Sequence, residues 1–533
     1  MFAVIILAAA LRVYGLRWGL PNTLHGYSYH PDEFLTVTTA YLTMYAGRSL
    51  LPGFYNYPTL YIYLCILAIA VAQGYGLVSN EAGIYLSARV VTVIMGVAAV
   101  SVTYWAGKRL YSAAAGLIAA LVLCIAPLHA QHSHFATVDV PSTVFVAASL
   151  GFAGLIMTRG SWRDYVLAGA MVGLAGGTKY NAGVVVFSIV AAHLLRGRVT
   201  WQSIASGRLW TSLGCAIAAF IISTPGVVLQ TPAFLHGIGY EVAHASEGHG
   251  LVFAGTGCGF VYTFTSSLWY GLGPPLAFLF PASALYALWR RDRSGLVILA
   301  FVIPYYVLIS LSQVRFARYA LPLFPAVALL CGWFAREMWL RVSTRWLRWS
   351  WAGACVVAAV FTLVYTLALD RLFTVPDPRD QAARWVFAHV RKEPIGLIDV
   401  PWFYTPPLSK QLGTASLLNQ PRTWEEFEEV VRSTPYELLI FSRSDKPGSW
   451  WEDGHPPKWA IVSSYEIDDA LRLRHDKRLT EDQRDQVRRI LADLDLITRH
   501  YVPKEQFGDL LHLSLPHDMG YTDPRITIYE LRR

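Results

Sequence analysis

The amino-acid sequence predicts a polytopic α-helical membrane protein that carries a small soluble α/β domain at its C-terminal end. Two observations support this fold class. Of the 533 residues, 54% are hydrophobic and only 15% are charged, whereas a soluble globular domain has about 25% charged residues. The apolar residues also form long runs up to residue 370 and then stop. We therefore expect a transmembrane domain over residues 1–370 and a soluble domain over residues 371–533.

The apolar runs have the length of membrane-spanning helices. A helix that crosses the hydrocarbon core needs about 20 mostly apolar residues. The candidate spans are 2–19, 58–76, 83–106, 112–128, 140–158, 164–178, 181–195, 209–228, 272–290, 294–312, 319–337 and 349–369. The first run carries its arginines at its end and lacks a small-residue cleavage pattern. We therefore expect a retained helix there and no signal peptide.

Short basic loops give the expected orientation. Lys and Arg are concentrated in the cytoplasmic loops of membrane proteins. The basic loops of this chain are 107–109, 159–163, 196–198, 290–293 and 336–348. With these loops in the cytoplasm, the N-terminus is cytoplasmic. The outer segments are then 20–57, 129–139, Lys179, 229–271, 313–318 and everything after residue 370. We predict a multi-pass protein of the inner (plasma) membrane with an extracytoplasmic C-terminal domain.

The apolar run at 58–76 does not fit this alternation. Three crossings between the first outer loop and Asp139 would place the two on opposite faces of the membrane. We therefore predict that 58–76 is re-entrant or interfacial, which leaves about 11 full crossings. The alternative is that Asp139 is cytoplasmic.

The C-terminal segment has the pattern of a small α/β domain. Asp377-Pro378 is a typical helix start, and helices are also predicted over 424–432 and 480–497. Short apolar runs at 395–400 and 437–441 predict buried strands.

Charge and cysteine content argue against two other classes of protein. The net charge is +8, but the basic residues sit in short loops between apolar runs, and no basic and aromatic stripe is present. We expect no nucleic-acid binding. The six cysteines contain no C-x-x-C motif and suggest neither a disulfide nor a zinc site.

The densest group of ionisable residues in the outer loops is His30-Pro31-Asp32-Glu33. Two adjacent carboxylates beside a histidine can act as a general base, bind a divalent cation or hold a cationic group. Pro-Asp-Glu is also a good helix start, so Asp32 could instead cap an interfacial helix. Both roles are compatible, because an acid at a helix N-terminus is held firmly in place.

A second group lies at the mouth of another helix. It comprises His129, His132, His134 and Asp139. Three histidines and an acid suggest a metal site, but their spacing matches no strong zinc signature, and histidines at a membrane boundary are often polar lining. Asp139 begins a long apolar run and could be an N-cap.

Cations complete the expected chamber on the outer face. Lys179 lies between two apolar helices, and Arg315 and Arg318 precede Tyr319 in an outer segment. Outer arginines run against the positive-inside bias, which indicates an anionic ligand such as a phosphate; a lipid-headgroup anchor is the alternative. The loop 229–271, which contains Glu241, could cover such a site. Acids facing cations suit a reaction between a lipid-linked phosphate and a nucleophile.

The order of these motifs resembles that of integral-membrane glycosyltransferases of the GT-C class, closest to glycosyltransferase family 39, which includes protein O-mannosyltransferases and aminoarabinose transferases. The resemblance covers about residues 1–370. The matching elements are Leu11 to Leu16, Asp32-Glu33, Asn56 to Leu60, Arg89, Asp139, Gly177-Thr178-Lys179, and Arg315 to Pro325.

The resemblance implies transfer of a sugar from a polyprenyl-phosphate carrier to an acceptor, with inversion at the anomeric carbon and no cofactor or metal. The implied catalytic residues are Asp32 as general base, with Glu33 and Asp139. The implied substrate-binding residues are His30, Tyr57, Arg89, His132, His134, Lys179, Arg315, Arg318 and Tyr319. Tyr57 and Thr59 replace the Lys or His and the second Pro of the family motif, which leaves open whether the acceptor is a lipid, a glycan or a protein.

Three other classes of protein are alternatives to a glycosyltransferase. A transporter or flippase for a lipid-linked substrate would predict inverted repeats and broken helices, which the sequence does not show. A membrane anchor for the C-terminal domain leaves the outer charges without a purpose. A polymerase or ligase that uses a carrier diphosphate is the remaining enzyme class.

Overall fold

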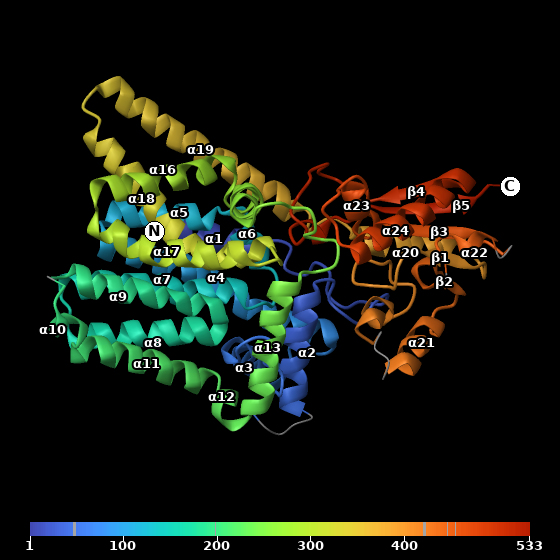
Figure 1. Ribbon diagram of the computed structural model, residues 1–533, viewed down its shortest axis with the longest axis horizontal. Helices are drawn as coiled ribbons and strands as arrows, with labels where there is room; N and C mark the ends of the chain where they lie inside the picture. The colour runs from blue at the N-terminus through green and yellow to red at the C-terminus, as the bar shows by residue number, and fades with distance from the viewer. Residues whose placement is uncertain (46–49, 198, 419–422, 445, 453–454, 533) are drawn as a thin grey trace.

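The computed structural model describes residues 1–45, 50–197, 199–418, 423–444, 446–452 and 455–532. Arg198, in one of the predicted cytoplasmic loops, lies outside these residues. Most of the long helices run side by side to form a bundle, and a smaller unit with a β-sheet sits at one end of it (Figure 1). We call the end of the bundle that faces this unit the outer end.

The bundle contains the chain up to residue 371. Its helices are α1 (Phe2–Val13), α2 (Pro31–Tyr45), α3 (Leu60–Gly74), α4 (Glu81–Leu110), α5 (Ala113–Cys124), α6 (Pro127–His132), α7 (Asp139–Thr158), α8 (Trp162–Thr178), η1 (Tyr180–Val185), α9 (Val186–Leu195), α10 (Trp201–Ile204), α11 (Gly207–Ser223), α12 (Gly226–Leu229), α13 (Thr231–Glu247), α14 (Gly259–Tyr262), η2 (Thr263–Leu268), α15 (Trp269–Leu272), α16 (Pro274–Arg290), α17 (Arg293–Leu311), η3 (Ala317–Leu323), α18 (Phe324–Arg341) and α19 (Arg345–Arg371).

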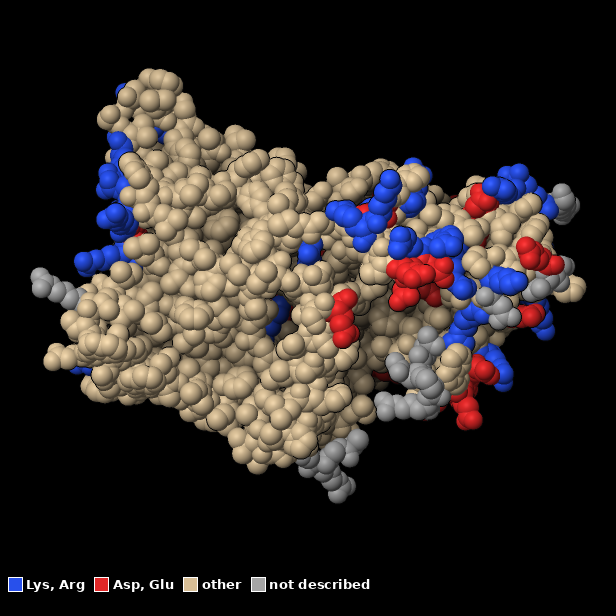
Figure 2. Space-filling view, in the orientation of Figure 1, with Lys and Arg blue, Asp and Glu red and all other residues tan. Residues whose placement is uncertain are grey.

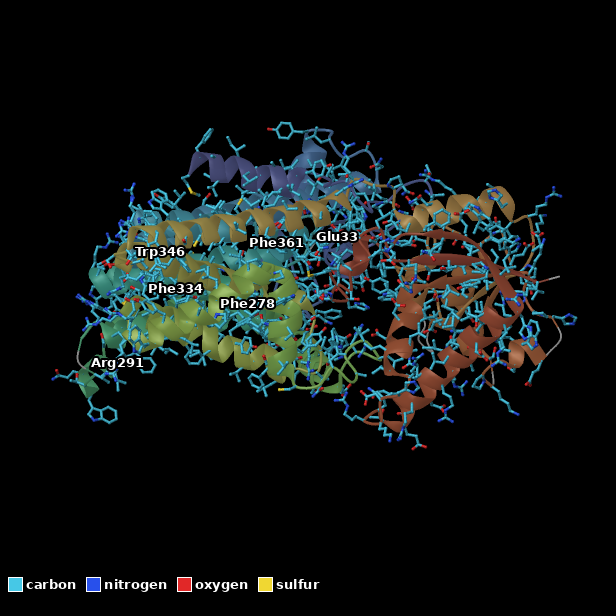
Figure 3. All side chains as sticks on the ribbon, turned by 90° about the horizontal axis from the view of Figure 1, so that it is seen from above. Glu33, Phe278, Arg291, Phe334, Trp346 and Phe361 are labelled. Atoms are coloured by element: carbon cyan, nitrogen blue, oxygen red, sulfur yellow. The ribbon has the colours of Figure 1, made fainter. Side chains whose placement is uncertain are left out.

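Six helical stretches of the described chain are long and apolar enough to cross a membrane. They correspond to α4, α7, α10–α11, α17, η3–α18 and α19. Shorter apolar helices are α1, α3, α5 and η1–α9. The surface carries a broad band with few charges, and Lys and Arg side chains gather at the end of the bundle remote from the C-terminal unit (Figure 2). Arg291 lies at that end and Glu33 at the outer end (Figure 3). This separation agrees with the predicted orientation.

Helix α3 begins and ends at the outer end of the bundle. At its start, the Thr59 hydroxyl donates to the carbonyl of Ser223, the last residue of α11. Soon after its end, Glu81 opens α4 with its carboxylate against Gly26, whose amide is bonded to the carbonyl of Lys410 in the C-terminal unit. That the segment 58–76 is interfacial or re-entrant stays a prediction. Helices α2 and α13 also run across the direction of the long helices (Figure 1).

Small residues allow α8 and α11 to pack with their backbones in close contact. Gly169, Gly173 and Gly177 recur every fourth residue of α8 and so line one face of it. A Cβ added at Gly169 would lie 2.0 Å from the Ser212 carbonyl oxygen, and one at Gly173 would lie 2.2 Å from that of Ala216. Such spacing of small residues is a common means of helix association in membranes, where helices gain no hydrophobic driving force against each other.

The C-terminal unit contains a five-stranded mixed sheet in the order β2-β1-β3-β5-β4. Its elements are α20 (Pro378–His389), β1 (Ile395–Leu397), η4 (Leu412–Leu418), α21 (Trp424–Arg432), β2 (Leu438–Ile440), η6 (Phe441–Arg443), α22 (Ser449–Glu452), β3 (Trp459–Ser463), α23 (Ser464–Leu473), α24 (Glu481–His500), β4 (Tyr501–Phe507), η7 (Gly520–Thr522) and β5 (Ile526–Leu531). Strand β1 is parallel to β2 and β3, whereas β5 is antiparallel to β3 and β4.

The loop between β4 and β5, residues 508–525, joins this unit to the bundle. Met519 is fully buried in the main hydrophobic core of the bundle, and Leu511 and Leu515 pack against that core. The Gln131 side chain, in α6, donates to the Met519 carbonyl at 2.8 Å. A hairpin loop of the C-terminal unit therefore fills the outer end of the bundle.

The predicted fold class is confirmed at the level of a mostly helical membrane protein with a small C-terminal sheet; the crossing count and the orientation stay predictions. The segments predicted as helices and strands in the C-terminal part coincide with α20, β1, α21, β2 and α24. Strands β3, β4 and β5 and helix α23 were not predicted from the sequence. Strand β4 has exposed residues over most of its length, and for that reason it lacks the apolar pattern that marks a strand.

A Gly169→Ala substitution tests the α8–α11 contact. The added methyl group would meet backbone that cannot move aside, so we expect a loss of about 1–3 kcal/mol in stability, seen as a lower Tm in detergent. Gly214→Ala on α11 is the control, since nothing lies within 4 Å of its Cβ, and Ala is favoured over Gly in helices. An unchanged Tm for Gly169→Ala would contradict the packing described here.

Candidate active site

Charged side chains from the bundle and the C-terminal unit meet at the outer end, around Arg318. An Arg318 guanidinium nitrogen lies 2.8 Å from a carboxylate oxygen of Asp32, and the two side chains are 8% and 17% exposed. Arg318 sits in the 3-10 turn η3, and Asp32 sits in the first turn of α2. The predicted helix start is present, but α2 begins at Pro31, so Asp32 lies inside its first turn and is not its N-cap.

Asp518, from the β4–β5 loop, holds the turn that carries Arg318. Its two carboxylate oxygens accept hydrogen bonds from the backbone amides of Ala317 and Arg318, each at 2.9 Å. One oxygen also lies 3.5 Å from the Arg318 guanidinium. These amides begin a helical turn and have no partner within it. The C-terminal unit thus supplies the carboxylate that orients Arg318 from behind, while Asp32 faces it from α2.

Lys179 and Asp139 form a second ion pair next to the first. The Lys179 ammonium donates to Asp139 at 2.5 Å, and both side chains are nearly buried. Asp139 is the first residue of α7, and Lys179 follows the last residue of α8. Both cations lie near the ring of Tyr319, with the Lys179 nitrogen 4.9 Å and the Arg318 guanidinium carbon 5.7 Å from its centroid. Predicted residues from four separate segments are therefore brought together here.

Glu33 and Arg89 form a closed ion pair away from this group. Arg89 donates two hydrogen bonds to the Glu33 carboxylate, at 2.7 and 2.8 Å, and neither side chain is exposed. Glu33 also accepts from the Ser28 hydroxyl and the Ala136 amide, while Arg89 reaches the carbonyls of Leu16 and Trp18. With their hydrogen-bonding capacity used in this way, the two buried side chains join the loops around the site.

The histidines divide into two kinds. His134 has Nδ1 facing the carbonyl of Ala130 and Nε2 facing that of Tyr14, so it ties α6 to the end of α1. The rings of His30 and His132 lie 6.0 Å apart, and their buried nitrogens have no hydrogen-bond partner among the described residues. Burial lowers the pKa of His132 to about 4, so the ring is neutral at pH 7 and has one donor and one acceptor nitrogen.

Tyr57 and Glu241 face the Asp32 side of the site. Burial, together with the Asp32 carboxylate, raises the pKa of Tyr57 well above its usual value. The same two causes raise the pKa of Glu241, on α13, to about 7. Arg315 points elsewhere: its guanidinium donates to Thr256 and to the Gly257 carbonyl, at 2.8 and 2.9 Å. The structure therefore separates the two arginines that the sequence places three residues apart.

The sequence analysis left Asp518 unassigned. His517-Asp518 lies in a loop that follows an exposed strand, and no local pattern marks it as part of the bundle. Only the acid–histidine pair in a Pro-bounded segment could have signalled it. Across the described parts of the chain, no cluster of three or more His, Cys, Asp or Glu side chains is arranged to hold a metal ion.

The chain is similar to known proteins in part of its sequence and in its fold. Residues 80–227 match the family of dolichyl-phosphate-mannose-protein mannosyltransferases, a segment that contains Arg89, Asp139 and Lys179. A comparison with curated protein sequences finds no significant match.

Solved structures extend the similarity to the whole chain. ArnT from Cupriavidus metallidurans, bound to undecaprenyl phosphate, matches with a TM-score of 0.53 and 16% identity over 99% of this chain and 97% of that chain. The oligosaccharyltransferase of Archaeoglobus fulgidus in its apo form gives a TM-score of 0.50 and 14% identity over 95% of this chain and 73% of that one. The resemblance to GT-C glycosyltransferases is confirmed, and the chain has their fold.

A Glu33→Gln substitution tests whether Glu33 contributes more to stability than its neighbour Asp32. We expect a loss of about 3–5 kcal/mol, because the change leaves the buried Arg89 charge without its counter-ion. Asp32→Asn is the matched control. We expect a smaller loss of stability for it, because Asp32 is partly exposed and Arg318 can still pair with Asp518. Thermal unfolding in detergent measures both. Equal Tm values for the two variants would contradict a structural role for Glu33.

Proposed function

We propose that this protein is a glycosyltransferase that moves a sugar from a polyprenyl-phosphate carrier to an acceptor at the outer face of the membrane, with inversion at the anomeric carbon. The observation that carries the proposal is the meeting of Asp32 with Arg318 and of Asp139 with Lys179 in one nearly buried group. The GT-C fold supports it, as does the undecaprenyl phosphate bound by ArnT, a protein of similar fold. The kind of sugar, hexose or pentose, stays open.

The proposed reaction is a single displacement. Asp32 takes the proton of an acceptor hydroxyl, and the oxygen attacks the anomeric carbon from the face opposite the phosphate. The bond between that carbon and the phosphate oxygen breaks, and the polyprenyl phosphate leaves with the electron pair. One displacement inverts the configuration. Arg318 and Lys179 would stabilise the negative charge that grows on the leaving phosphate.

The environment of the carboxylates suits these roles. Burial raises the pKa of Asp32, and the nearby Arg318 guanidinium opposes this effect. A carboxylate with a raised pKa is a stronger base than one in water. Asp139 would hold Lys179 in place, and Tyr57, Tyr319 and the neutral His30–His132 pair would complete the substrate contacts. We assign Glu33, Arg89 and His134 to the frame of the site, and Arg315 to its cover.

The proposed location follows from the same geometry. The basic end of the bundle would face the cytoplasm, with the N-terminus there, and the domain from residue 371 onward would lie outside the inner membrane. A carrier lipid in the membrane could then present its phosphate to the outer end of the bundle. No cofactor is needed for this chemistry, because the carrier phosphate is already a good leaving group.

Asp32→Asn tests the base. We expect transfer to fall by at least about 100-fold, since a general base contributes about that much or more. In the wild type, activity is lost as the pH falls through the Asp32 pKa, at a higher pH than the usual value of about 3.9 for Asp. The assay supplies a panel of polyprenyl-phosphate sugars and membrane extract, and mass spectrometry follows the free polyprenyl phosphate. If the Asp32→Asn variant still releases polyprenyl phosphate at the wild-type rate, the general base is another residue.

Arg318→Gln tests the phosphate contact, with Arg315→Gln as the matched control. We expect the Kd for undecaprenyl phosphate to rise about 10- to 100-fold for Arg318→Gln, the effect of losing one charge-assisted hydrogen bond. Arg315 is directed at the loop around Thr256, so its change should stay below about fivefold. Equal changes in Kd for the two variants would argue against a phosphate contact by Arg318. If the wild type bound undecaprenyl phosphate tightly but transferred no sugar, a lipid transporter would be favoured.

A further inference from the structure

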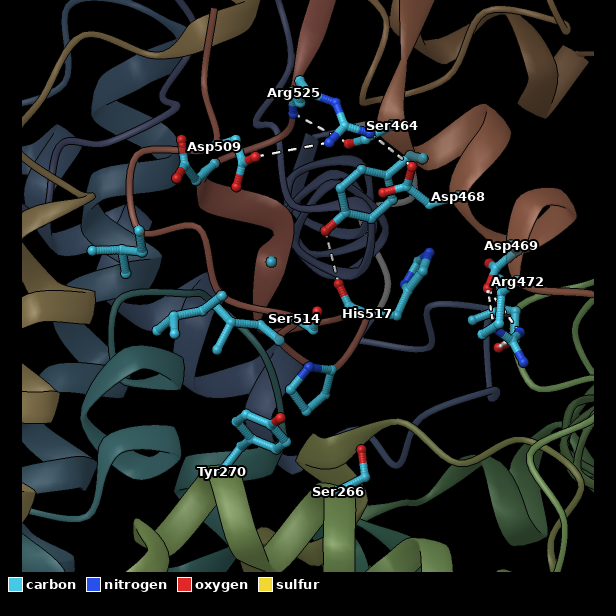
Figure 4. A pocket seen from close by; sticks show the side chains of 18 of the residues that line it. Ser266, Tyr270, Ser464, Asp468, Asp469, Arg472, Asp509, Ser514, His517 and Arg525 are labelled. Carbon is cyan, nitrogen blue, oxygen red and sulfur yellow. Dashed lines mark hydrogen bonds and ion pairs between the residues drawn. The ribbon is translucent and has the colours of Figure 1, made fainter. Parts of the chain in front are cut away.

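The described residues form two large hollows at the outer end of the bundle. The first is a cavity of about 610 Å³ between the bundle and the C-terminal unit, with polar side chains such as Ser266 in its lining (Figure 4). Its arginines are already paired with its carboxylates, Arg472 with Asp469 and Arg525 with Asp468. The second is a groove of about 870 Å³ at the outer ends of α1 and α4, and its charges are arranged differently.

One side of this groove is an apolar stripe of α4. Ala82, Leu86 and Val90 line the groove, and their spacing of four residues places them on one face of the helix. The stripe continues to Ile94, which is 62% exposed. Val13, at the end of α1, also lines the groove and is 54% exposed. Helix α4 is long and apolar enough to cross a membrane, so the groove leads into a surface that would face lipid chains.

Residues that follow α19 complete the lining. Phe373 and Val375 contribute to it, as does Asp380 in the first turn of α20. The chain after α19 packs closely on the chain after α1, because a Cβ added at Gly15 would lie only 2.4 Å from the Cβ atom of Phe373. The groove is therefore built from both parts of the protein, and a molecule in it would contact both.

Arg17 supplies a free positive charge to the groove. It lines the groove and is exposed, and it has no ion-pair partner among the described residues. It follows the end of α1 at the outer end of the bundle, where an arginine runs against the positive-inside bias. A guanidinium group matches the geometry of a phosphate, and lipid headgroups present phosphates at the boundary of a membrane.

Asp380 supplies a negative charge. It accepts hydrogen bonds from the Asn22 amide, at 2.9 Å, and from the Tyr29 hydroxyl, and both donors are neutral. The Nε2 atom of His25 lies 3.6 Å away, but this atom accepts from Asn22 while Nδ1 donates to the Tyr27 carbonyl. Burial also lowers the pKa of His25, so the ring is neutral at pH 7.

The neighbouring arginine does not neutralise Asp380 either. Arg379 donates two hydrogen bonds to Asp377, at 2.8 and 2.6 Å, and its side chain is fully buried. Asp380 has a side chain that is 16% exposed. The groove thus offers one cation, Arg17, and one anion, Asp380, which are not paired with each other. A headgroup with a phosphate and an ammonium group has the complementary charges.

We propose that this groove binds a zwitterionic phospholipid of the outer leaflet, with a phosphoethanolamine headgroup. The phosphate would pair with Arg17, the ammonium group would lie against Asp380, and an acyl chain would follow the α4 stripe from Leu86 to Ile94. The inference goes beyond the proposed reaction, since none of these side chains belongs to the group around Arg318. A lipid held here would join the end of α1 to α20 and so stabilise the docking of the C-terminal unit.

Native mass spectrometry of the full chain in detergent tests this by measuring the Kd of added lipid. The probes are phosphatidylethanolamine, phosphatidylglycerol and diacylglycerol with the same chains, and glycerophosphoethanolamine, which is the headgroup without chains. We expect phosphatidylethanolamine to bind most tightly. Arg17→Gln should raise the Kd of both phospholipids about 10-fold, the effect of losing one charge-assisted hydrogen bond. Arg371→Gln removes an exposed charge at the end of α19, outside the groove, and should change neither Kd.

Asp380→Asn separates the two charges of the headgroup. It should raise the Kd of phosphatidylethanolamine about 10-fold and should not raise that of phosphatidylglycerol, which carries no ammonium group. Val90→Trp fills the groove and keeps both charges, so it should weaken both phospholipids alike, which guards against an effect of misfolding in the Asp380 variant. Ile303→Trp, at a similarly exposed position of α17, is its control and should weaken neither.

Thermal unfolding of the same preparations reports the effect on docking. Added phosphatidylethanolamine should raise the Tm of the wild type more than that of Arg17→Gln, because a ligand stabilises the state that binds it. The proposal is overturned if diacylglycerol or the headgroup without chains binds as tightly as phosphatidylethanolamine. It is also overturned if Arg371→Gln acts as strongly as Arg17→Gln, if Val90→Trp binds lipid as Ile303→Trp does, or if Asp380→Asn weakens both phospholipids equally.

Discussion

The position of Arg318 between two carboxylates is the interaction on which the outer end of this protein depends. Asp32 reaches it from α2 and Asp518 from the C-terminal unit. A nearly buried guanidinium is costly unless it is paired and hydrogen-bonded. The pairing of Arg318 with Asp518 therefore requires the β4–β5 loop to stay docked in the bundle. If the C-terminal unit undocked, the candidate site would lose this contact.

The adjacent acids Asp32 and Glu33 show how one turn of helix can serve two purposes. Glu33 is turned inward and shares its full hydrogen-bonding capacity with Arg89, Ser28 and Ala136. Asp32 is turned toward solvent and the cations. The buried Glu33–Arg89 pair fixes the start of α2, so the less buried Asp32 is held at a defined position.

Neighbouring residues of the β4–β5 loop face two sides, the candidate site and a cavity between the bundle and the C-terminal unit. Asp518 faces the bundle and orients Arg318, while His517 and Asp523 face the cavity. The ring of Phe316 lies 6.0 Å from that of His517 and 3.9 Å from the Arg318 guanidinium, so it separates the cavity from the cationic centre.

The sequence by itself determined the apolar helices, the basic end of the bundle and most of the charged residues at the site, because hydrophobic runs and charges in outer loops are local signals. It also indicated that a helix begins close to Asp32. Only the tertiary structure decided which of these charges meet: it brought Asp32, Asp139, Lys179 and Arg318 together, withdrew Glu33 and Arg89 into a closed pair, turned Arg315 away and added Asp518 from the far end of the chain. Contacts between segments hundreds of residues apart leave no periodic pattern in a sequence, since they depend on how helices and loops pack.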